Sequence, residues 1–274
     1  MKDRMRFGIS SWCYPWSMGV TVGPQPVKKM TALQLLEKAA EYKVDLVQIA
    51  ENLPLENLTR NELEDVKDFA VANGISIEAG TKGIEKAHLL KLLEIASYLQ
   101  SPILRVLPAF FGSSAVMKEV ETSIREVLPY FEREGITIVL ENTEAFKAND
   151  YAGLMKRIDH PSFRMCLDLA NALGTMEGPE YVMQKLLPYI GNFHFKDVKV
   201  TRSETVIGFS VFGTPAGKGD LSLPWIIEQL ETSGLNPSII VELWPTFTEN
   251  IQKTMLLEDD WVRQSVDYLK SVVG

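Results

Sequence analysis

Four apolar runs of this sequence end in side chains that can bind a metal ion. The runs are ITIVLE ending at Glu141, FRMCLD at Asp168, NFH at His194 and SIIVE at Glu242. A short apolar run buried on both faces is typical of a strand in a parallel sheet, and such strands present their carboxyl ends on one common side. Three carboxylates and an imidazole brought together there would repel one another without a cation, and this oxygen-rich set suits a divalent metal ion.

Each of these residues also has an ordinary explanation, because a carboxylate after a strand is often a solvated loop residue or a helix cap. The combination is more informative than any single residue. Side chains in a strand alternate between two faces, so Glu141 shares a face with Val139. Glu242 shares a face with Ile240 in the same way. These consistent registers favour one shared site over four unrelated loop residues.

Eight strand-like runs alternate with helical patterns along the chain. The runs lie near Arg6 to Ser11, Val44 to Ile49, Ile75 to Ala79, Ile103 to Leu107, Ile136 to Leu140, Phe163 to Leu167, Gly191 to Phe195 and Ser238 to Val241. Strict alternation predicts a single (β/α)8 TIM-barrel domain over residues 1–274, with active-site residues at the carboxyl ends of the strands. The alternative is a doubly wound open sheet, whose nucleotide-binding form needs a glycine fingerprint that FGISSWCYPW lacks.

Helical periodicity follows each of these runs. The expected helices cover Thr31 to Tyr42, a segment after Thr59, Glu85 to Leu99, Ser114 to Glu134, Asn149 to Ile158, Glu180 to Tyr189, Leu221 to Glu231 and Glu258 to Val272. Thr31 with Gln34, and Thr59 with Glu62, have the spacing of a capping box, which marks the first residues of a helix.

Composition narrows the class of protein. The chain has 274 residues, of which 46% are apolar, enough for a large core. Its net charge of -8 argues against sequence-independent binding of nucleic acid, which needs a basic surface. Cys13 and Cys166 lack CxxC spacing, so neither a disulfide framework nor a thiolate zinc site is indicated. The amino-terminal region has no apolar segment of sufficient length for a signal peptide or membrane span, so we expect a cytoplasmic protein that binds no membrane. We also expect a homo-oligomer, a dimer or tetramer.

The motifs together resemble the xylose isomerase-like TIM-barrel superfamily, which contains sugar isomerases and epimerases and also the apurinic-site endonucleases. The resemblance runs from GISSW in the first strand through LEN, CLDLAN, HFKD and GKGD to VELWP. Ketose 3-epimerases of this group hold one Mn²⁺, Mg²⁺ or Co²⁺ with Glu, Asp, His and Glu in this order. The resemblance therefore implies that Glu141, Asp168, His194 and Glu242 are metal ligands, with Zn²⁺ as a further candidate ion. It also makes Glu141 and Glu242 the catalytic acid and base.

Two positions depart from that pattern. Asn171 stands where relatives often carry a histidine, and it can bind a substrate hydroxyl but cannot transfer a proton near neutral pH. Gln48 stands where relatives often end the second strand in a glutamate. The particular sugar of a known epimerase therefore cannot be carried over to this chain.

Three cations lie near predicted strand ends. Lys82 follows the third strand, Arg105 lies inside the fourth, and Lys196 shares a strand face with His194. Lys82 is equally compatible with a solvated loop. An inward-pointing Arg105 needs a partner, for which Glu78 is a candidate, because an unpaired buried charge is costly. Cations that face the barrel mouth would instead bind a carboxylate or phosphate of the substrate, with arginine gripping it through two hydrogen bonds.

Aromatic residues near the strand ends are candidates for a sugar-binding wall, although packing is their usual role. They are Trp12, Trp16, Phe110, Phe111 and Trp244, of which we assign Trp12 to the substrate site. The segment GTPAGKGD, residues 213–220, departs from Walker spacing. We interpret it as a flexible loop that could close over substrate or hold an anion in a backbone nest. His88 and His160 are expected to lie outside the site.

One divalent ion between two glutamates best serves removal of a proton next to a carbonyl, through a metal-stabilised enediolate. The sequence therefore predicts an isomerase or epimerase of a small-molecule sugar or sugar acid. The alternative is a decarboxylase of a β-keto sugar acid, favoured by Lys82, Arg105 and a TKG turn similar to that of sugar-acid decarboxylases. An endonuclease is disfavoured because its trizinc cluster needs many histidines and the chain has three. An intact metal quartet disfavours a non-catalytic binding barrel.

Overall fold

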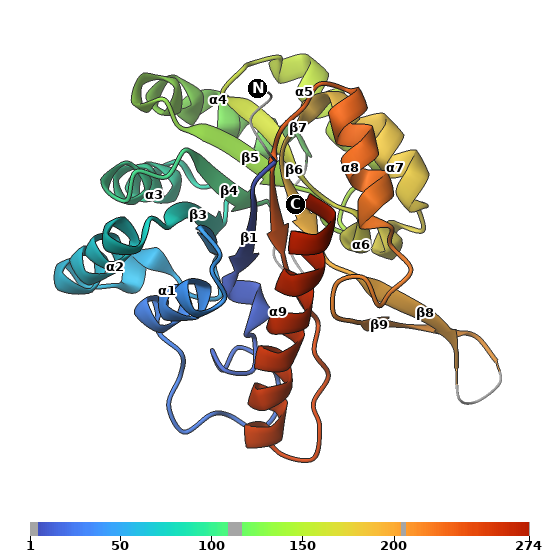
Figure 1. Cartoon of the computed structure of the whole chain (residues 1–274). Coiled ribbons are helices and arrows are strands. Elements are labelled where there is room, and N and C mark those ends of the chain that lie inside the picture. Colours follow the sequence, from blue (N-terminus) through green and yellow to red (C-terminus); the bar gives the residue numbers. More distant parts are fainter. Residues whose placement is uncertain (1–4, 109–116, 204–206, 274) are drawn as a thin grey trace.

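Eight parallel strands form a closed barrel in the computed structural model, which describes residues 5–108, 117–203 and 207–273 (Figure 1). They are β1 (Phe7–Ser10), β2 (Leu46–Ile49), β3 (Ser76–Lys82), β4 (Ile103–Leu107), β5 (Thr137–Glu141), β6 (Phe163–Asp168), β7 (Ile190–Phe195) and β10 (Ser238–Val241). Each predicted run overlaps one of these strands. The third strand continues beyond its predicted end, so Lys82 is its last residue and does not follow it.

Pairing of the first and last strands decides between the barrel and the open sheet. The first strand, β1, lies between β2 and β10, with Gly8 opposite Ile240. Because the remaining neighbours also pair in parallel, no edge is left between these eight strands. The predicted (β/α)8 barrel is therefore confirmed, and the strand ends meet at one mouth.

Helices surround the barrel on its outer side (Figure 1). They are α1 (Ala32–Glu41), α2 (Arg60–Asn73), α3 (Lys86–Tyr98), α4 (Met117–Glu134), α5 (Ala148–Ile158), α6 (Leu169–Ala172), α7 (Pro179–Leu186), α8 (Leu223–Thr232) and α9 (Ile251–Val273). Short 3-10 turns occupy Ser11–Cys13, Leu55–Asn57, Leu173–Thr175 and Leu187–Tyr189. The start predicted for α4, at Ser114, lies outside the described residues. Among the described residues, no helix has both the length and the apolar composition of a membrane span.

Both predicted capping boxes are present. Gln34 N donates to Thr31 Oγ1 at 3.3 Å while Thr31 N donates to the Gln34 side chain at 3.0 Å. Thr59 and Glu62 make the same reciprocal pair at the start of α2. These bonds satisfy backbone donors that a helix start otherwise leaves without partners, which is why this short pattern locates a helix reliably.

Two features were not predicted from periodicity. The last helix begins at Ile251 and not at Glu258, because Asn250 Oδ1 accepts a 2.9 Å hydrogen bond from Lys253 N and caps it. A hairpin of β8 (Val198–Arg202) and β9 (Phe209–Gly213) also projects from the barrel between β7 and α8 (Figure 1).

The loop after this hairpin differs from its interpretation as an open anion nest. The Asp197 carboxylate accepts hydrogen bonds from the backbone N–H groups of Gly217 and Gly219, both at 2.8 Å. It also accepts from Leu221 N at 3.2 Å. The N–H groups that could have held a substrate anion are therefore bonded to the protein's own carboxylate, and the loop is tied to the end of β7.

Candidate active site

The carboxyl ends of the strands open into a cavity of about 940 Å³. Glu141 at the end of β5 and Glu242 directly after β10 are part of its wall. Asp168 at the end of β6 and His194 in β7 are buried and are not among the residues that line the cavity. The four residues predicted to converge therefore do so, each supplied by a different strand.

The four side chains have the arrangement of a metal site. One possible ligand atom from each lies within 4.8 Å of those of the others. His194 Nδ1 lies 3.3 Å from Glu242 Oε1 and 3.4 Å from Glu141 Oε2, yet this buried nitrogen forms no hydrogen bond. A buried polar atom without a partner is costly, and carboxylate oxygens around an imidazole nitrogen are suitable ligands for a divalent ion. These residues fit such an ion.

The charged groups around His194 also suit a metal ion. Burial alone would lower the pKa of His194, but Cys166, Glu242 and Glu141 around it raise that pKa well above its ordinary value. Without a metal ion the ring therefore tends to hold an additional proton. A metal ion that binds through Nδ1 has to replace that proton.

Lys196 shares two carboxylates of this quartet. Its Nζ donates to Asp168 Oδ2 at 2.7 Å, lies 3.0 Å from Glu242 Oε2, and sits 4.9 Å from the ring centroid of Trp244. Burial opposes its charge, but Asp168 and Glu242 raise the pKa of Lys196 above the ordinary lysine value. A buried ammonium group is therefore part of the cavity wall.

Arg105 forms the second buried cation. Its Nε donates to Glu141 Oε2 and its Nη1 donates to Glu51 Oε2, so Arg105 is paired with carboxylates as expected, but the candidate partner Glu78 is not one of them. Glu51 is oriented in turn by Trp12, whose Nε1 donates to it at 3.1 Å. Burial alone would raise the pKa of Glu141, but the charges of Arg105 and the histidine ring lower it below its ordinary range.

All five residues predicted to bind substrate line this one cavity. They are Trp12, Lys82, Arg105, Asn171 and Lys196. The amide of Asn171 links the two halves of the site, since its Nδ2 donates to Glu141 Oε1 at 2.9 Å and its Oδ1 accepts from Lys196 at 3.4 Å. Their side chains are therefore gathered around a space large enough for a sugar-sized ligand.

Several buried polar residues at and below the site were not predicted as site residues from the sequence. Glu51 lies in the loop after β2, where strand periodicity gives no information about side-chain direction. Gln48, Glu78 and Asn192 are polar residues within apolar strands, and all three are buried. Only Gln48 had been noted as unusual, and no role was assigned to it from the sequence. Polar residues at strand centres were the signal, because they must find partners inside the barrel.

The other residues singled out from the sequence divide between packing and the cavity wall. Trp244 lines the cavity, whereas Trp16 is buried and donates to Pro245 O at 2.7 Å. Phe110 and Phe111 lie outside the described residues. His160 accepts from Ser162 N at 3.1 Å in a turn, and His88 lies 2.7 Å from Thr81 Oγ1.

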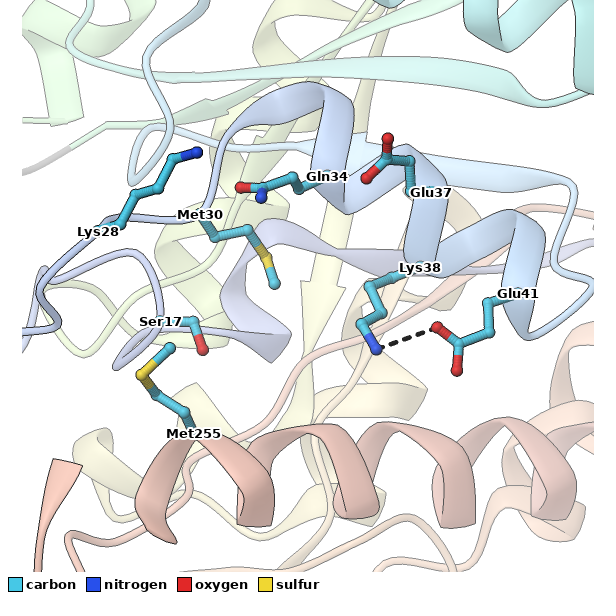
Figure 2. Close-up of a pocket in the computed structure, with 8 residues that line it drawn as sticks. All are labelled: Ser17, Lys28, Met30, Gln34, Glu37, Lys38, Glu41 and Met255. Atoms are coloured by element: carbon cyan, nitrogen blue, oxygen red, sulfur yellow. Dashed lines mark hydrogen bonds and ion pairs between the residues drawn. The ribbon is translucent and has the colours of Figure 1, made fainter. Parts of the chain in front are cut away.

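A second cavity of about 360 Å³ lies outside the barrel, against α1 and α9 (Figure 2). Figure 2 shows Lys38 and Glu41 of α1 joined by an ion pair beside Met30 and Met255. Lys38 also lies 3.0 Å from Asp259. Its cation is already paired on the outer surface, so we assign the chemistry to the barrel mouth.

A closed parallel barrel with acidic and cationic side chains at the carboxyl ends of its strands is typical of TIM-barrel enzymes, whose active sites lie at that end. The chain belongs to the xylose isomerase-like TIM barrel family, whose family model matches residues 36–272. It is 31% identical over 265 residues to 3-oxo-isoapionate decarboxylase of Pectobacterium atrosepticum, an alignment that covers 97% of this chain and 95% of that protein.

Solved structures of this fold include sugar epimerases. D-psicose 3-epimerase of Clostridium cellulolyticum H10, solved with D-tagatose, superposes with a TM-score of 0.75 at 17% identity, covering 98% of this chain and 99% of that one. A xylose isomerase-like barrel protein of Mycobacterium smegmatis, solved in complex with magnesium, has a TM-score of 0.72 at 15% identity, with 98% of both chains covered. Identities this low show a shared fold and not a shared reaction.

Proposed function

We propose that this protein is a carboxy-lyase that releases CO2 from a β-keto sugar acid. The observation that carries the proposal is the full-length similarity to 3-oxo-isoapionate decarboxylase, combined with two buried cations among the carboxylates of the cavity. In a 3-oxo acid the carbonyl carbon is β to the carboxylate, so the electrons of the breaking carbon–carbon bond can pass to the carbonyl oxygen. Such a substrate is an anion, which Arg105 and Lys196 are suited to hold.

We further propose that one divalent ion, Mn²⁺, Mg²⁺ or Co²⁺ or else Zn²⁺, is held by Glu141, Asp168, His194 and Glu242. The unpartnered nitrogen of His194 among three carboxylates supports this assignment. When bound, the ion would supply Lewis-acid stabilisation of negative charge on the substrate oxygen.

The chain's own residues carry the remaining steps. Arg105 and Lys196 orient the substrate carboxylate, and Trp12 and Trp244 supply apolar surface to the wall of the cavity. Loss of CO2 leaves a carbanion that must take up one proton. Lys196 holds a proton on Nζ, so it can donate that proton to the carbon and regain one from solvent, while Glu242 Oε2, 3.0 Å away, keeps the ammonium group in place.

Epimerisation or isomerisation of a ketose or sugar acid is the second candidate. The metal quartet in the chain order of ketose 3-epimerases favours it, with Glu141 and Glu242 as the two proton-transfer groups. Epimerisation differs from decarboxylation because it requires a base that removes a C–H proton. Glu141 is less suited to that role while it is paired with Arg105 and Asn171.

The two reactions are separated by incubating the metal-loaded protein in D2O with a set of β-keto sugar acids and ketoses. We expect one CO2 per β-keto acid consumed, with one deuterium on the carbon that carried the carboxylate. Glu242→Gln and Lys196→Met should each slow CO2 release by about 10²-fold, the usual size of an acid/base contribution. Lys199→Met, a change at an exposed lysine of the hairpin, should leave the rate unchanged.

Each alternative has its own result. Deuterium uptake by ketoses without CO2 would transfer the assignment to the epimerase. Cleavage of abasic DNA, with neither CO2 release nor deuterium uptake, would contradict both proposals.

A further inference from the structure

A layer of buried polar side chains lies inside the barrel beneath the metal quartet. Gln48 of β2, Glu78 of β3 and Asn192 of β7 are all buried, and Ser238 of β10 completes the layer. Asn192 precedes His194 by two residues, so both side chains point into the barrel. The layer therefore lies on the amino-terminal side of the imidazole.

The hydrogen bonds within this layer fix the orientation of the Gln48 amide. Gln48 Nε2 donates to Glu78 Oε2 at 3.1 Å and to Asn192 Oδ1 at 3.2 Å. Glu78 also accepts from Asn192 Nδ2 at 3.1 Å and from Ser238 Oγ at 2.6 Å. Rotating the amide by half a turn would place its oxygen against two acceptors, so the network selects one orientation.

The orientation of the Gln48 amide determines which nitrogen of the His194 ring carries a proton. With its amide nitrogen committed to the layer, Gln48 presents Oε1 to His194 Nε2 at a distance of 2.8 Å. An amide oxygen can only accept, so Nε2 must carry a proton. The nitrogen on the opposite edge of the ring, Nδ1, faces Glu141 and Glu242.

We infer that Gln48 and Glu78 are positioning residues that keep a proton on His194 Nε2 and thereby reserve Nδ1 for the metal ion. The inference rests on the proposed metal site. Without an acceptor at Nε2, a neutral ring would gain most by carrying its single proton on Nδ1, where two carboxylates can accept it. That tautomer would have no lone pair for the ion, and it is the form that the layer disfavours.

The direct readout is the nitrogen NMR spectrum of the histidine rings. The chain has three histidines, so Nδ1 and Nε2 of His194 can be assigned with His88→Asn and His160→Asn variants. We expect Nε2 of His194 to be protonated in the metal-free protein and in the Mg²⁺-loaded protein. In the loaded protein Nδ1 should have lost its proton. An unprotonated Nε2 in either state would overturn the inference.

Metal affinity supplies the second readout, measured by titration calorimetry with Mn²⁺. Gln48→Met keeps the length of the side chain but removes the acceptor, and it should weaken Mn²⁺ binding about 10- to 100-fold, as loss of a ligand's supporting hydrogen bond does. Exchanging the two groups, in the double variant Gln48→Glu with Glu78→Gln, restores an acceptor for Nε2 and a donor for that acceptor. This variant should recover most of the affinity.

A matched control separates positioning from folding. Ser101 is buried, and its Oγ donates to Ile103 O and accepts from Ala79 N, so it supports the strand that carries Glu78, while neither bond involves Gln48, Glu78 or Asn192. Ser101→Ala should therefore lower stability without changing Mn²⁺ affinity. Unchanged affinity in Gln48→Met, or an equal loss in Ser101→Ala, would contradict the inference. If Nε2 is protonated as expected but the wild-type protein binds no ion, the proposed metal site fails and the hydrogen-bonded layer stands.

Discussion

Lys196 Nζ donates a 2.7 Å hydrogen bond to Asp168 Oδ2 and lies 3.0 Å from Glu242 Oε2. Two of the four proposed metal ligands thus share a side-chain cation. An ammonium group and a divalent ion repel each other at such short range, so binding of the ion should weaken the contact between Lys196 and Asp168. Released from Asp168, the lysine would be available to a substrate anion.

Replacing Lys196 should show whether its ammonium group and the metal ion compete for the same carboxylates. Lys196→Met removes the partner of buried carboxylates, which typically costs about 3–5 kcal/mol, so the metal-free variant should melt well below the wild-type protein. Mn²⁺ should then raise the Tm of the variant more than that of the wild type, because it no longer competes with an ammonium group. Thermal melts with chelator and with Mn²⁺ measure both effects, with Lys199→Met as the control. Equal Mn²⁺ effects in variant and wild type would argue against a shared site.

A second prediction concerns removal of the ion itself. Stripping the protein with a chelator should lower its Tm, because ligand binding to the folded state stabilises it by about 2.7 kcal/mol when the free ligand is at 100 times its Kd. Mn²⁺, Mg²⁺ or Co²⁺ should restore the loss. Asp168→Asn should abolish the response, whereas Asp220→Asn, a change at an exposed carboxylate in the loop after the hairpin, should preserve it. The metal assignment fails if metal analysis finds no ion and the Tm ignores all of them.

The strands and the metal quartet could be predicted because their signals are local. A buried parallel strand is an apolar run, and alternation within it determines which terminal residue shares a face with Val139 or Ile240. The partners of Arg105 could not be predicted in this way. Glu51 reaches it from a loop, whose backbone path no periodicity describes, while Glu78, the nearer candidate in a strand, is bonded to Gln48 and Asn192 instead.

The hairpin shows a different limit of sequence reading. Its strands, Val198–Arg202 and Phe209–Gly213, pair with each other and with none of the barrel strands. The fold was predicted from strict alternation of strand and helix. That pattern includes no additional strands between β7 and α8, so the hairpin was not predicted. The polar residues of the Gln48 layer were lost for a related reason, because a pattern search for apolar runs passes over single polar residues inside them.

Recognition of a substrate carboxylate gives a third prediction. Arg105→Lys keeps the charge but removes the planar fork that binds a carboxylate through two hydrogen bonds. Loss of one such charge-assisted bond is worth about 1.5–3 kcal/mol, so kcat/KM for a β-keto sugar acid should fall about 10- to 100-fold, mainly through KM. Binding of neutral sugars should change little. Arg125→Lys, at an exposed arginine of α4, is the matched control. Tight binding of neutral sugars that Arg105→Ala does not affect would refute an anionic substrate.

The last prediction concerns Glu258, a fully buried carboxyl of α9 that accepts hydrogen bonds from the loop after β1. Its oxygens accept from Trp16 N at 2.6 Å, from Ser17 N at 2.9 Å and from Ser17 Oγ at 2.5 Å. Burial outweighs these bonds and raises the pKa of Glu258 from 4.5 to about 7. At pH values between 4.5 and about 7, Glu258 keeps its proton in the folded protein but has lost it in the unfolded chain. Its contribution to the free energy of unfolding must therefore fall as the pH rises through this interval.

Other carboxylates also titrate in that range, so the comparison is with Glu258→Gln, which cannot ionise. From pH 4.5 to pH 8 the wild type should lose about 3 kcal/mol of unfolding free energy relative to the variant, at 1.36 kcal/mol per unit of pKa shift. Asp260→Asn, at a more exposed carboxylate of the same helix, should leave the pH profile of the wild type unchanged. Denaturant unfolding at several pH values measures the difference. A wild type that gains stability over Glu258→Gln with rising pH would mean that the three hydrogen bonds outweigh burial, and that this helix is anchored to the loop by an ionised carboxylate.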